Sequence, residues 1–172
     1  MTAQLAPLVI MGVSGSGKST IGELLATALD LKFVDGDTLH PQANKDKMRR
    51  GIPLDDFDRT PWLHIIGQHL TQRDSTGRPV IIACSALKRS YRDLLRTHDP
   101  RTRFVFLIGG SELIQQRLDA RDHEYMPSSL LHSQLETLEE PSADEQPIRV
   151  DITLSPQAIV ASVIAQLSPD AS

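Results

Sequence analysis

The eight residues from Gly12 to Ser19, GVSGSGKS, restrict the possible folds of this chain more than any other segment. They match the phosphate-binding pattern GxxxxGK[ST], follow the short apolar run Leu8–Met11, and precede apolar residues at helical spacing from Ile21 to Leu29. Glycines let backbone N–H groups turn toward phosphate oxygens, and the start of a helix adds positive dipole character. We therefore predict a nucleotide-binding loop between a strand and a helix, rather than a glycine-rich turn that only closes a corner.

The residue types in this loop indicate what each would do. Lys18 is expected to neutralise charge on the β- and γ-phosphates of a nucleotide, and the Ser19 hydroxyl is suited to binding Mg²⁺. The predicted nucleotide site comprises Gly12, Val13, Ser14, Gly15, Ser16, Gly17, Lys18, Ser19 and Thr20. The stretch Asn44–Lys47 resembles a guanine-reading NKxD motif, but it ends in lysine and comes too early in the chain. A GTPase is therefore disfavoured.

Short apolar runs alternate with longer amphipathic segments along the rest of the chain, as in a parallel sheet covered by helices. Further strands are predicted at Lys32–Asp35, Pro79–Cys84, Arg103–Ile108 and Ile148–Ile152. The predicted helices cover Pro41–Arg50, Pro61–Arg73, Ala86–Arg96, Ser111–Arg121, Ser128–Leu138 and Pro156–Leu167. Gly51–Asp56 and Asp122–Pro127 are expected to be loops, and Glu139–Pro147 a solvated connector. We predict one α/β domain over residues 1–172, a three-layer sandwich whose five-stranded parallel sheet has helices on both faces.

Composition excludes several classes of protein. The 172 residues carry 18 basic and 22 acidic side chains, and this net charge of -4 argues against a general polyanion binder. An aromatic content of 4% disfavours a stacking surface for single-stranded nucleic acid. One cysteine, Cys84, cannot form an internal disulfide, and no stretch approaches the roughly 20 apolar residues of a membrane span. We expect a cytoplasmic protein that binds neither nucleic acid nor membranes.

Charge is unevenly distributed along the chain. Residues 1–120 carry 16 basic and 13 acidic side chains, a net of +3, whereas residues 121–172 carry 2 and 9, a net of -7. The candidate functional cations all fall in the first part, except Arg121, which is the first residue of the second. We therefore predict a cationic cleft in a protein that is acidic overall.

Two carboxylates follow the second predicted strand, in the sequence Asp35-Gly36-Asp37. They would lie at the carboxyl edge of a parallel sheet, where open α/β folds bind ligands. One carboxylate can hold a metal-bound water while the other accepts a proton from an attacking hydroxyl, so the pair could serve phosphoryl transfer. The alternative is an ordinary Asp-Gly turn.

Basic side chains after the P-loop unit supply further candidates. Arg117 and Arg121 lie four residues apart on a helix and could stack on adenine, fork onto phosphate oxygens, or only complement the helix dipole. Lys88, Arg89 and Arg92 follow the third strand, where a Walker B acid of the DExx type is missing. The absence of that acid favours a small-molecule kinase over a motor ATPase.

These motifs together resemble the gluconokinase family, P-loop kinases that phosphorylate gluconate with ATP. The resemblance covers roughly residues 8–165 and rests on Met11–Ser19, Asp35–Pro41 with Asn44, Lys47 and Met48, Gly51–Leu54, Asp58–Leu63, Cys84–Lys88 with Tyr91–Asp93, Arg117-Leu118 with Arg121, Met126-Pro127, Leu130-Leu131, Ser133-Gln134 and Thr137–Glu139. It implies transfer of the γ-phosphoryl group of ATP to the 6-hydroxyl of D-gluconate, which gives 6-phospho-D-gluconate. It also implies a fold similar to shikimate and nucleoside-monophosphate kinases, a lid at about residues 121–128, Mg²⁺ as cofactor, and often a homodimer.

Site roles follow from the residues and the resemblance together. We expect Asp37 to accept the proton of the 6-hydroxyl, Asp35 to hold a Mg²⁺-bound water with Ser19 nearby, and Lys18 with Arg121 to stabilise the transferring group. Arg117 would join Arg121 at the nucleotide. A gluconate carboxylate suits a bidentate arginine, for which Arg49, Arg59 and Arg92 all remain candidates. The hydroxyls would be met by Asp37, His40, Asn44 and Lys88.

Other functions compatible with the sequence are a P-loop kinase for a different sugar acid or a shikimate-like acceptor, and a nucleotide-binding regulator without catalysis. ATP-dependent nucleic-acid processing is disfavoured by the missing Walker B acid and the acidic composition.

Overall fold

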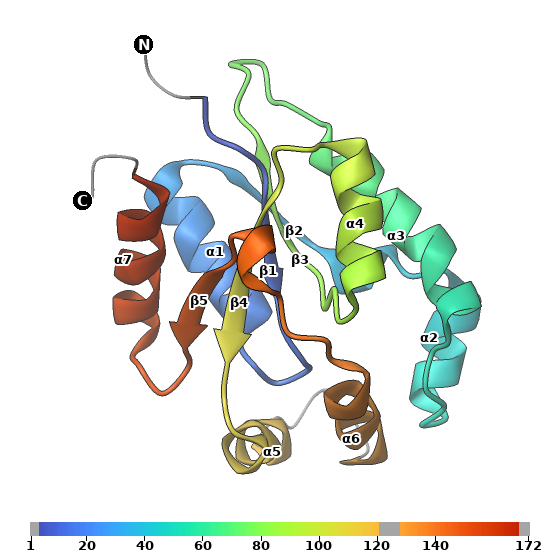
Figure 1. The fold of residues 1–172 in the computed structure, drawn as a ribbon. Helices are drawn as coiled ribbons and strands as arrows, with labels where there is room; N and C mark the ends of the chain where they lie inside the picture. Colours follow the sequence, from blue (N-terminus) through green and yellow to red (C-terminus); the bar gives the residue numbers. More distant parts are fainter. Residues whose placement is uncertain (1–3, 121–127, 169–172) are drawn as a thin grey trace.

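A computed structural model describes residues 4–120 and 128–168 of the chain (Figure 1). Its centre is a parallel five-stranded sheet with the strand order β2-β3-β1-β4-β5. The strands are β1 (Leu8–Met11), β2 (Lys32–Asp35), β3 (Val80–Ala83), β4 (Arg103–Ile108) and β5 (Ile148–Asp151). Each agrees with its predicted range to within one residue at either end. This sheet confirms the predicted fold class.

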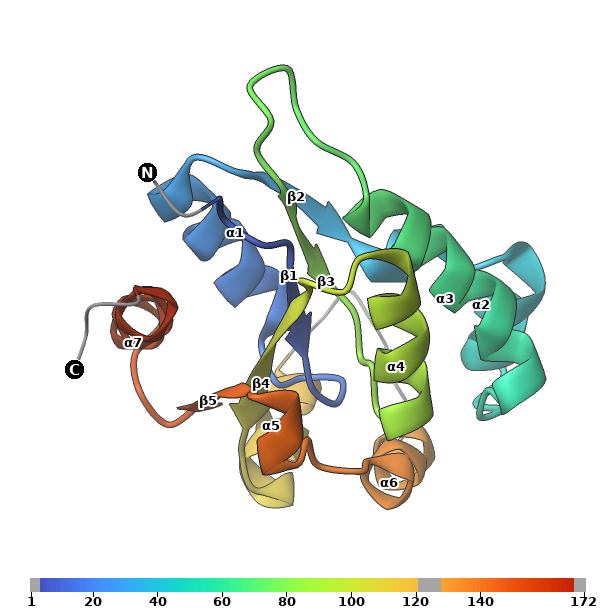
Figure 2. The ribbon, with the colours of Figure 1, turned by 45° about the horizontal axis from the view of Figure 1, so that its top comes forward.

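Helices cover both faces of the sheet, so the three-layer prediction is also confirmed (Figure 2). They are α1 (Lys18–Leu29), α2 (Gln42–Arg49), α3 (Asp56–Leu70), α4 (Arg89–His98), α5 (Ser111–Asp119), α6 (Ser128–Thr137) and α7 (Pro156–Leu167), with 3₁₀ turns η1 (Gly36–Leu39) and η2 (Ala143–Glu145). Helices α1 and α7 pack on one face and α3 and α4 on the other. Helices α5 and α6 lie at the end toward which the strands point (Figure 1). None of the described helices is long and apolar enough to cross a membrane.

The core is formed by strands that are apolar on both faces. All four residues of β1 and all four of β3 are buried, as the unbroken apolar runs predicted. Gly22 lets α1 approach β2 closely, because a Cβ at this position would lie 2.3 Å from Cε2 of Phe33. Strand β1, which lies in the middle of the sheet, ends directly at the phosphate-binding loop.

Helix α3 begins at Asp56, five residues before the predicted start at Pro61, so that prediction is wrong. Asp55 forms a capping box with Asp58: the Asp55 carboxylate accepts the Asp58 N–H at 2.8 Å, and the Asp58 carboxylate accepts the Asp55 N–H at 3.0 Å. Proline commonly starts a helix, which suggested the later boundary. Here the capping box fixes the start, and Pro61 lies inside the helix without an N–H to donate.

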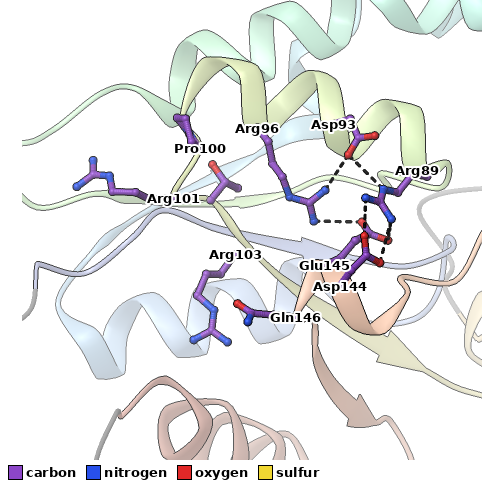
Figure 3. A pocket seen from close by; sticks show the side chains of 10 residues that line it. Arg89, Asp93, Arg96, Pro100, Arg101, Arg103, Asp144, Glu145 and Gln146 are labelled. Carbon is purple, nitrogen blue, oxygen red and sulfur yellow. Dashed lines mark hydrogen bonds and ion pairs between the residues drawn. The ribbon is translucent and has the colours of Figure 1, made fainter.

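Residues 139–147 were expected to be a solvated connector, but η2 within them packs firmly against α4. The Glu145 carboxylate, 1% exposed, accepts bonds from Arg92 Nε at 2.7 Å and Arg96 Nη2 at 3.1 Å. Burial alone would raise the pKa of Glu145, but the bonds from Arg92 and the Ser142 N–H lower it to about 2. Figure 3 shows the part of this network that lines the adjoining cavity, where Arg96 bonds to Glu145 and to Asp93. The cavity has a volume of about 400 Å³. The cavity lies beside the amino end of β4, whereas the phosphate-binding loop lies at the carboxyl end of the strands.

The buried ion pair predicts a large cost for its disruption. Glu145→Gln leaves the guanidinium of Arg92, which is 0% exposed, without its counter-charge, and should lower the free energy of unfolding by about 3 to 5 kcal/mol. Urea unfolding followed by circular dichroism measures this loss. The matched control is Asp144→Asn, because Asp144 is 63% exposed in its pair with Arg89 and should contribute little. Equal losses in the two variants would contradict the prediction.

Candidate active site

The phosphate-binding loop connects β1 to α1 in a conformation that depends on its glycines. Gly15 has a φ of 82°, and a Cβ there would lie 2.8 Å from Cγ of Leu118 on α5. Gly17, with a φ of 99°, precedes the first residue of α1. The N–H of Gly12 donates to the carbonyl of Ser85 at 3.3 Å, which joins the loop to the segment after β3. The loop is therefore held on both sides while its backbone can turn toward a phosphate.

The loop side chains fit a bound nucleotide. Lys18 is 9% exposed, and its Nζ donates to the Val13 carbonyl at 3.1 Å, so its charge is held inside the loop. The buried hydroxyl of Ser16 has no hydrogen-bond partner among the described residues. A phosphate oxygen would satisfy such a group, since unpaired buried polar atoms are rare in folded proteins. Thr20 lies in the first turn of α1 and is exposed.

Oxygen donors for a divalent cation meet beside the loop. Ser19 Oγ lies 3.4 Å from Asp35 Oδ2, which joins the start of α1 to the end of β2. Within the described ranges, no group of three or more His, Cys, Asp or Glu side chains could hold a metal by itself. A hydroxyl and one carboxylate fit Mg²⁺, which usually takes few protein ligands together with phosphates and waters.

The Asp35-Gly36-Asp37 segment forms the start of η1, held against the edge of the sheet. Asp35 caps this turn by accepting the Asp37 N–H at 3.0 Å. A Cβ at Gly36 would lie 2.3 Å from the carbonyl oxygen of Ala83, so only glycine allows this close approach to β3. The segment is thus a packed element rather than a free turn, and it leaves the Asp37 side chain exposed at the carboxyl edge.

A buried aromatic pair supports η1 from the side of α3. Trp62 Nε1 donates to the Gly36 carbonyl at 2.8 Å, and the His40 ring stacks on Trp62 with centroids 4.0 Å apart. Asn44 Nδ2 lies 3.2 Å from His40 Nδ1 and donates to the Asp58 carbonyl at 2.8 Å. Burial, followed by the charges of Arg59 and Lys45, lowers the pKa of His40 to about 4. His40 is therefore neutral at physiological pH.

Arg59 and Lys88 both lie close to Tyr91. Arg59, 8% exposed, donates from Nη1 to the Tyr91 hydroxyl at 3.1 Å, and Tyr91 donates to Asp56 Oδ1 at 2.5 Å. Lys88 Nζ donates to the same Asp56 oxygen at 3.1 Å. Two of the predicted substrate cations thus belong to one hydrogen-bonded cluster.

Cys84 lies at the end of β3, between the two parts of the site. It directly follows β3, is fully buried, and has a thiol pKa raised by burial to about 12, so it is not a nucleophile. The residues on either side of it contact both parts of the site: Ser85 accepts the Gly12 N–H, and the Ala83 carbonyl lies against Gly36. The phosphate-binding loop and the Asp35-Gly36-Asp37 segment therefore meet at the carboxyl end of β3.

Comparisons with known proteins agree with this geometry. The family described as "AAA domain" matches residues 8–141. The thermosensitive gluconokinase of Escherichia coli K12 is 49% identical over 148 residues, which cover 84% of this chain and 78% of that protein. The crystal structure of a gluconokinase from Sinorhizobium meliloti 1021 superposes with a TM-score of 0.86 at 48% identity, covering 94% of this chain and 91% of the other. The chain belongs to the gluconokinase family.

Less similar structures support the fold alone. Shikimate kinase from Aquifex aeolicus has a TM-score of 0.56 at 16% identity over 94% of this chain and 95% of that chain. The expected likeness of the gluconokinase family to shikimate kinases is thus confirmed at the level of fold.

Some of the predicted gluconokinase site residues do not meet at this point. Arg92 was a candidate for the substrate carboxylate, but it is completely buried and bonded to Glu145 and to the carbonyl of Ala86, so this expectation is corrected. Arg49 lies on the exposed end of α2, with its side chain 73% exposed and 3.7 Å from Asp46. Arg92 therefore has no exposed guanidinium for a substrate contact, whereas Arg49 stays a prediction.

Of the two arginines predicted to contact the nucleotide, only Arg117 lies within the described residues. Arg117 donates from Nη2 to the Ile152 carbonyl at 2.7 Å, and its Nη1 lies 3.9 Å from the Cβ position of Gly17. It therefore lies beside the start of α1, consistent with a nucleotide contact. Arg121 and most of the predicted lid lie outside the described residues.

Sequence reasoning missed three side chains at this site. Gln134 on α6 accepts the Ser14 N–H at 2.8 Å, so α6 is bonded to the phosphate-binding loop. The Ser133-Gln134 pair belonged to the family resemblance, but it suggested no role. Tyr91 was also part of the family resemblance, but neither it nor Asp56 was given a role, because they are 35 residues apart and their pairing depends on α3 packing against α4.

The low pKa of His40 is testable with the single tryptophan of the chain. Protonated histidine quenches a stacked indole, so Trp62 fluorescence should stay constant from pH 8 to pH 5 and change with a midpoint near pH 4. His40→Gln should abolish this transition while preserving the fold. A midpoint near pH 6.5, the usual histidine value, would show that the ring is not buried as described.

Proposed function

We propose that the protein phosphorylates D-gluconate at its 6-hydroxyl, using ATP and releasing ADP and 6-phospho-D-gluconate. The observation that carries this proposal is that the phosphate-binding loop with Lys18, the segment of Asp37, and helix α3 with Arg59 are joined at the carboxyl end of β3. It brings together a phosphate-neutralising lysine, a candidate base and a cation for an acid substrate. The identity to named gluconokinases supports the choice of gluconate.

On the nucleotide side, the loop backbone and Lys18 would hold the β- and γ-phosphates. Their positive charges are fixed before the reaction, so they stabilise developing charge without reorganising. Arg117 lies close enough to Gly17 to assist, and we propose that Arg121 joins it when the lid closes.

We propose Mg²⁺ as the cofactor, with Ser19 and Asp35 as its protein ligands, one of them acting through a water. When bound, the cation supplies charge neutralisation between the phosphates. Asp35 also accepts the Asp37 N–H, so the two carboxylates keep separate tasks. Asp37 is exposed at the carboxyl edge and would accept the proton of the 6-hydroxyl as the phosphoryl group is transferred.

Of the three candidate arginines, Arg59 is the best partner for the gluconate carboxylate. Its guanidinium is largely buried, and within the described residues its only hydrogen bond is the one from Nη1 to Tyr91. The remaining N–H groups are available for a bidentate contact. Lys88 and the neutral His40 would address hydroxyls, whereas Asn44 mainly supports His40.

The proposal also includes a homodimer and a cytoplasmic location. The family resemblance supports the homodimer, and the single cysteine, which cannot form an internal disulfide, is compatible with a reducing compartment.

A coupled ADP-release assay tests the acceptor. D-Gluconate should support turnover, whereas D-glucose and shikimate should support little, because the site has one strong carboxylate partner and hydroxyl-binding groups for a linear chain. Comparable activity on shikimate, or ADP release that no acceptor stimulates, would contradict the proposed substrate.

Loss of the base should affect the chemical step alone. Asp37→Asn should lower kcat by about 10² to 10⁴-fold and leave the Kd for a non-hydrolysable ATP analogue nearly unchanged. Steady-state kinetics and calorimetry measure the two quantities. Asp30→Asn is the control, because Asp30 caps the far end of α1. Wild-type turnover in Asp37→Asn would rule out this role.

A further inference from the structure

Asp56 brings a negative charge to the acceptor side of the site, although no step of the reaction needs it. It is the first residue of α3 and lies one helical turn before Arg59. Its Oδ1 accepts from both the Tyr91 hydroxyl, at 2.5 Å, and Lys88 Nζ, at 3.1 Å. A cleft that binds an anionic substrate would bind it more strongly without this carboxylate, so its presence needs a reason.

The cluster around Tyr91 has a definite net charge. Arg59 Cζ and Lys88 Nζ lie 5.5 and 5.6 Å from the centre of the Tyr91 ring, so both cations are held beside one aromatic ring. The hydrogen bond from Tyr91, followed by that from Lys88, lowers the pKa of Asp56, which is therefore ionised at neutral pH. Two positive charges and one negative charge leave a net charge of +1.

This charge matches one carboxylate group. Asp56 engages Lys88 directly and reaches Arg59 through the Tyr91 hydroxyl, so one cation is already compensated while Arg59 keeps open N–H groups. A neutral end group would leave the guanidinium of Arg59 without a counter-charge. A dianionic phosphate at the same place would face the Asp56 carboxylate with its second charge uncompensated.

We propose that Asp56 is a specificity residue, which makes the acceptor site select a monoanionic end group over a dianionic one, while the guanidinium of Arg59 disfavours a neutral one. Tyr91 is the positioning residue that connects Asp56 to Arg59. This inference rests on the proposed function, because it assumes that the acceptor carboxylate meets Arg59.

Two substitutions separate the charge of this cluster from its geometry. Asp56→Asn removes the charge but keeps an Oδ1 that accepts the Tyr91 hydroxyl. Tyr91→Phe keeps the ring and all three charges but removes the hydroxyl that bonds to Arg59. Asp30→Asn is the matched control, since it makes the same change of net charge at an 89% exposed carboxylate on the far end of α1.

Three acceptors with the same polyol chain and a free 6-hydroxyl provide the test. D-Glucitol, D-gluconate and D-glucitol 1-phosphate carry charges of 0, -1 and about -2 at the opposite end. The measured quantities are kcat/KM for each acceptor and, independently of turnover, the Kd of each by calorimetry.

In Asp56→Asn, the preference for D-glucitol 1-phosphate relative to D-gluconate should rise by about 3 to 30-fold, the effect of one unit charge at this range. Asp30→Asn should leave the ratio unchanged. Tyr91→Phe should raise KM for gluconate about tenfold, with kcat and nucleotide affinity close to wild type, because only the orientation of Arg59 is lost.

The inference is overturned if the preference of Asp56→Asn for D-glucitol 1-phosphate over D-gluconate stays within twofold of wild type. It is also overturned if neither the wild-type protein nor Asp56→Asn binds D-glucitol 1-phosphate measurably. Asp56→Ser serves as a second variant if the thermal midpoint of Asp56→Asn falls. Failure of the proposed function appears differently, as wild-type protein that does not turn over gluconate.

Discussion

The parallel pairing of β1 with both β3 and β4 is the constraint on which the site depends. Because the first strand of the chain lies in the middle of the sheet, the loop that follows it emerges between two neighbours rather than at an edge. The N–H of Gly12 bonds to Ser85 after β3, and Leu118 of α5 contacts Gly15 from the other side. Phosphate-binding groups are thereby fixed before any ligand arrives, which is what electrostatic catalysis requires.

The acceptor side is built differently, from helix packing rather than from strand ends. Trp62 joins α3 to η1, and Tyr91 of α4 joins Arg59 to Asp56 within α3. The phosphate-binding loop thus lies opposite an acceptor side whose charged groups are joined by hydrogen bonds between α3 and α4.

The fold was predictable from the sequence because its signals are local. Short apolar segments predicted the strands to within one residue, with unbroken apolar runs for β1 and β3, and GxxxxGK[ST] located the loop between β1 and α1. Predictions were wrong where a local sequence signal pointed one way and a side-chain interaction seen only in the structure decided the outcome. Pro61 suggested a helix start, but the Asp55 and Asp58 capping box begins α3 earlier. Arg92 looked available for substrate because its partner, Glu145, is 53 residues away in a segment of polar composition.

The ion pair of Glu145 also limits how α6 can move. Directly after this helix, the Glu139 N–H donates to the Leu87 carbonyl at 2.8 Å, and six residues later Glu145 is bonded to α4. The carboxyl end of α6 is therefore anchored to the same element that carries Tyr91. Because Gln134 also accepts the Ser14 N–H, α6 joins the phosphate-binding loop to the segment that carries the acceptor-side tyrosine, and its first residue, Ser128, lies farthest along the helix from both contacts.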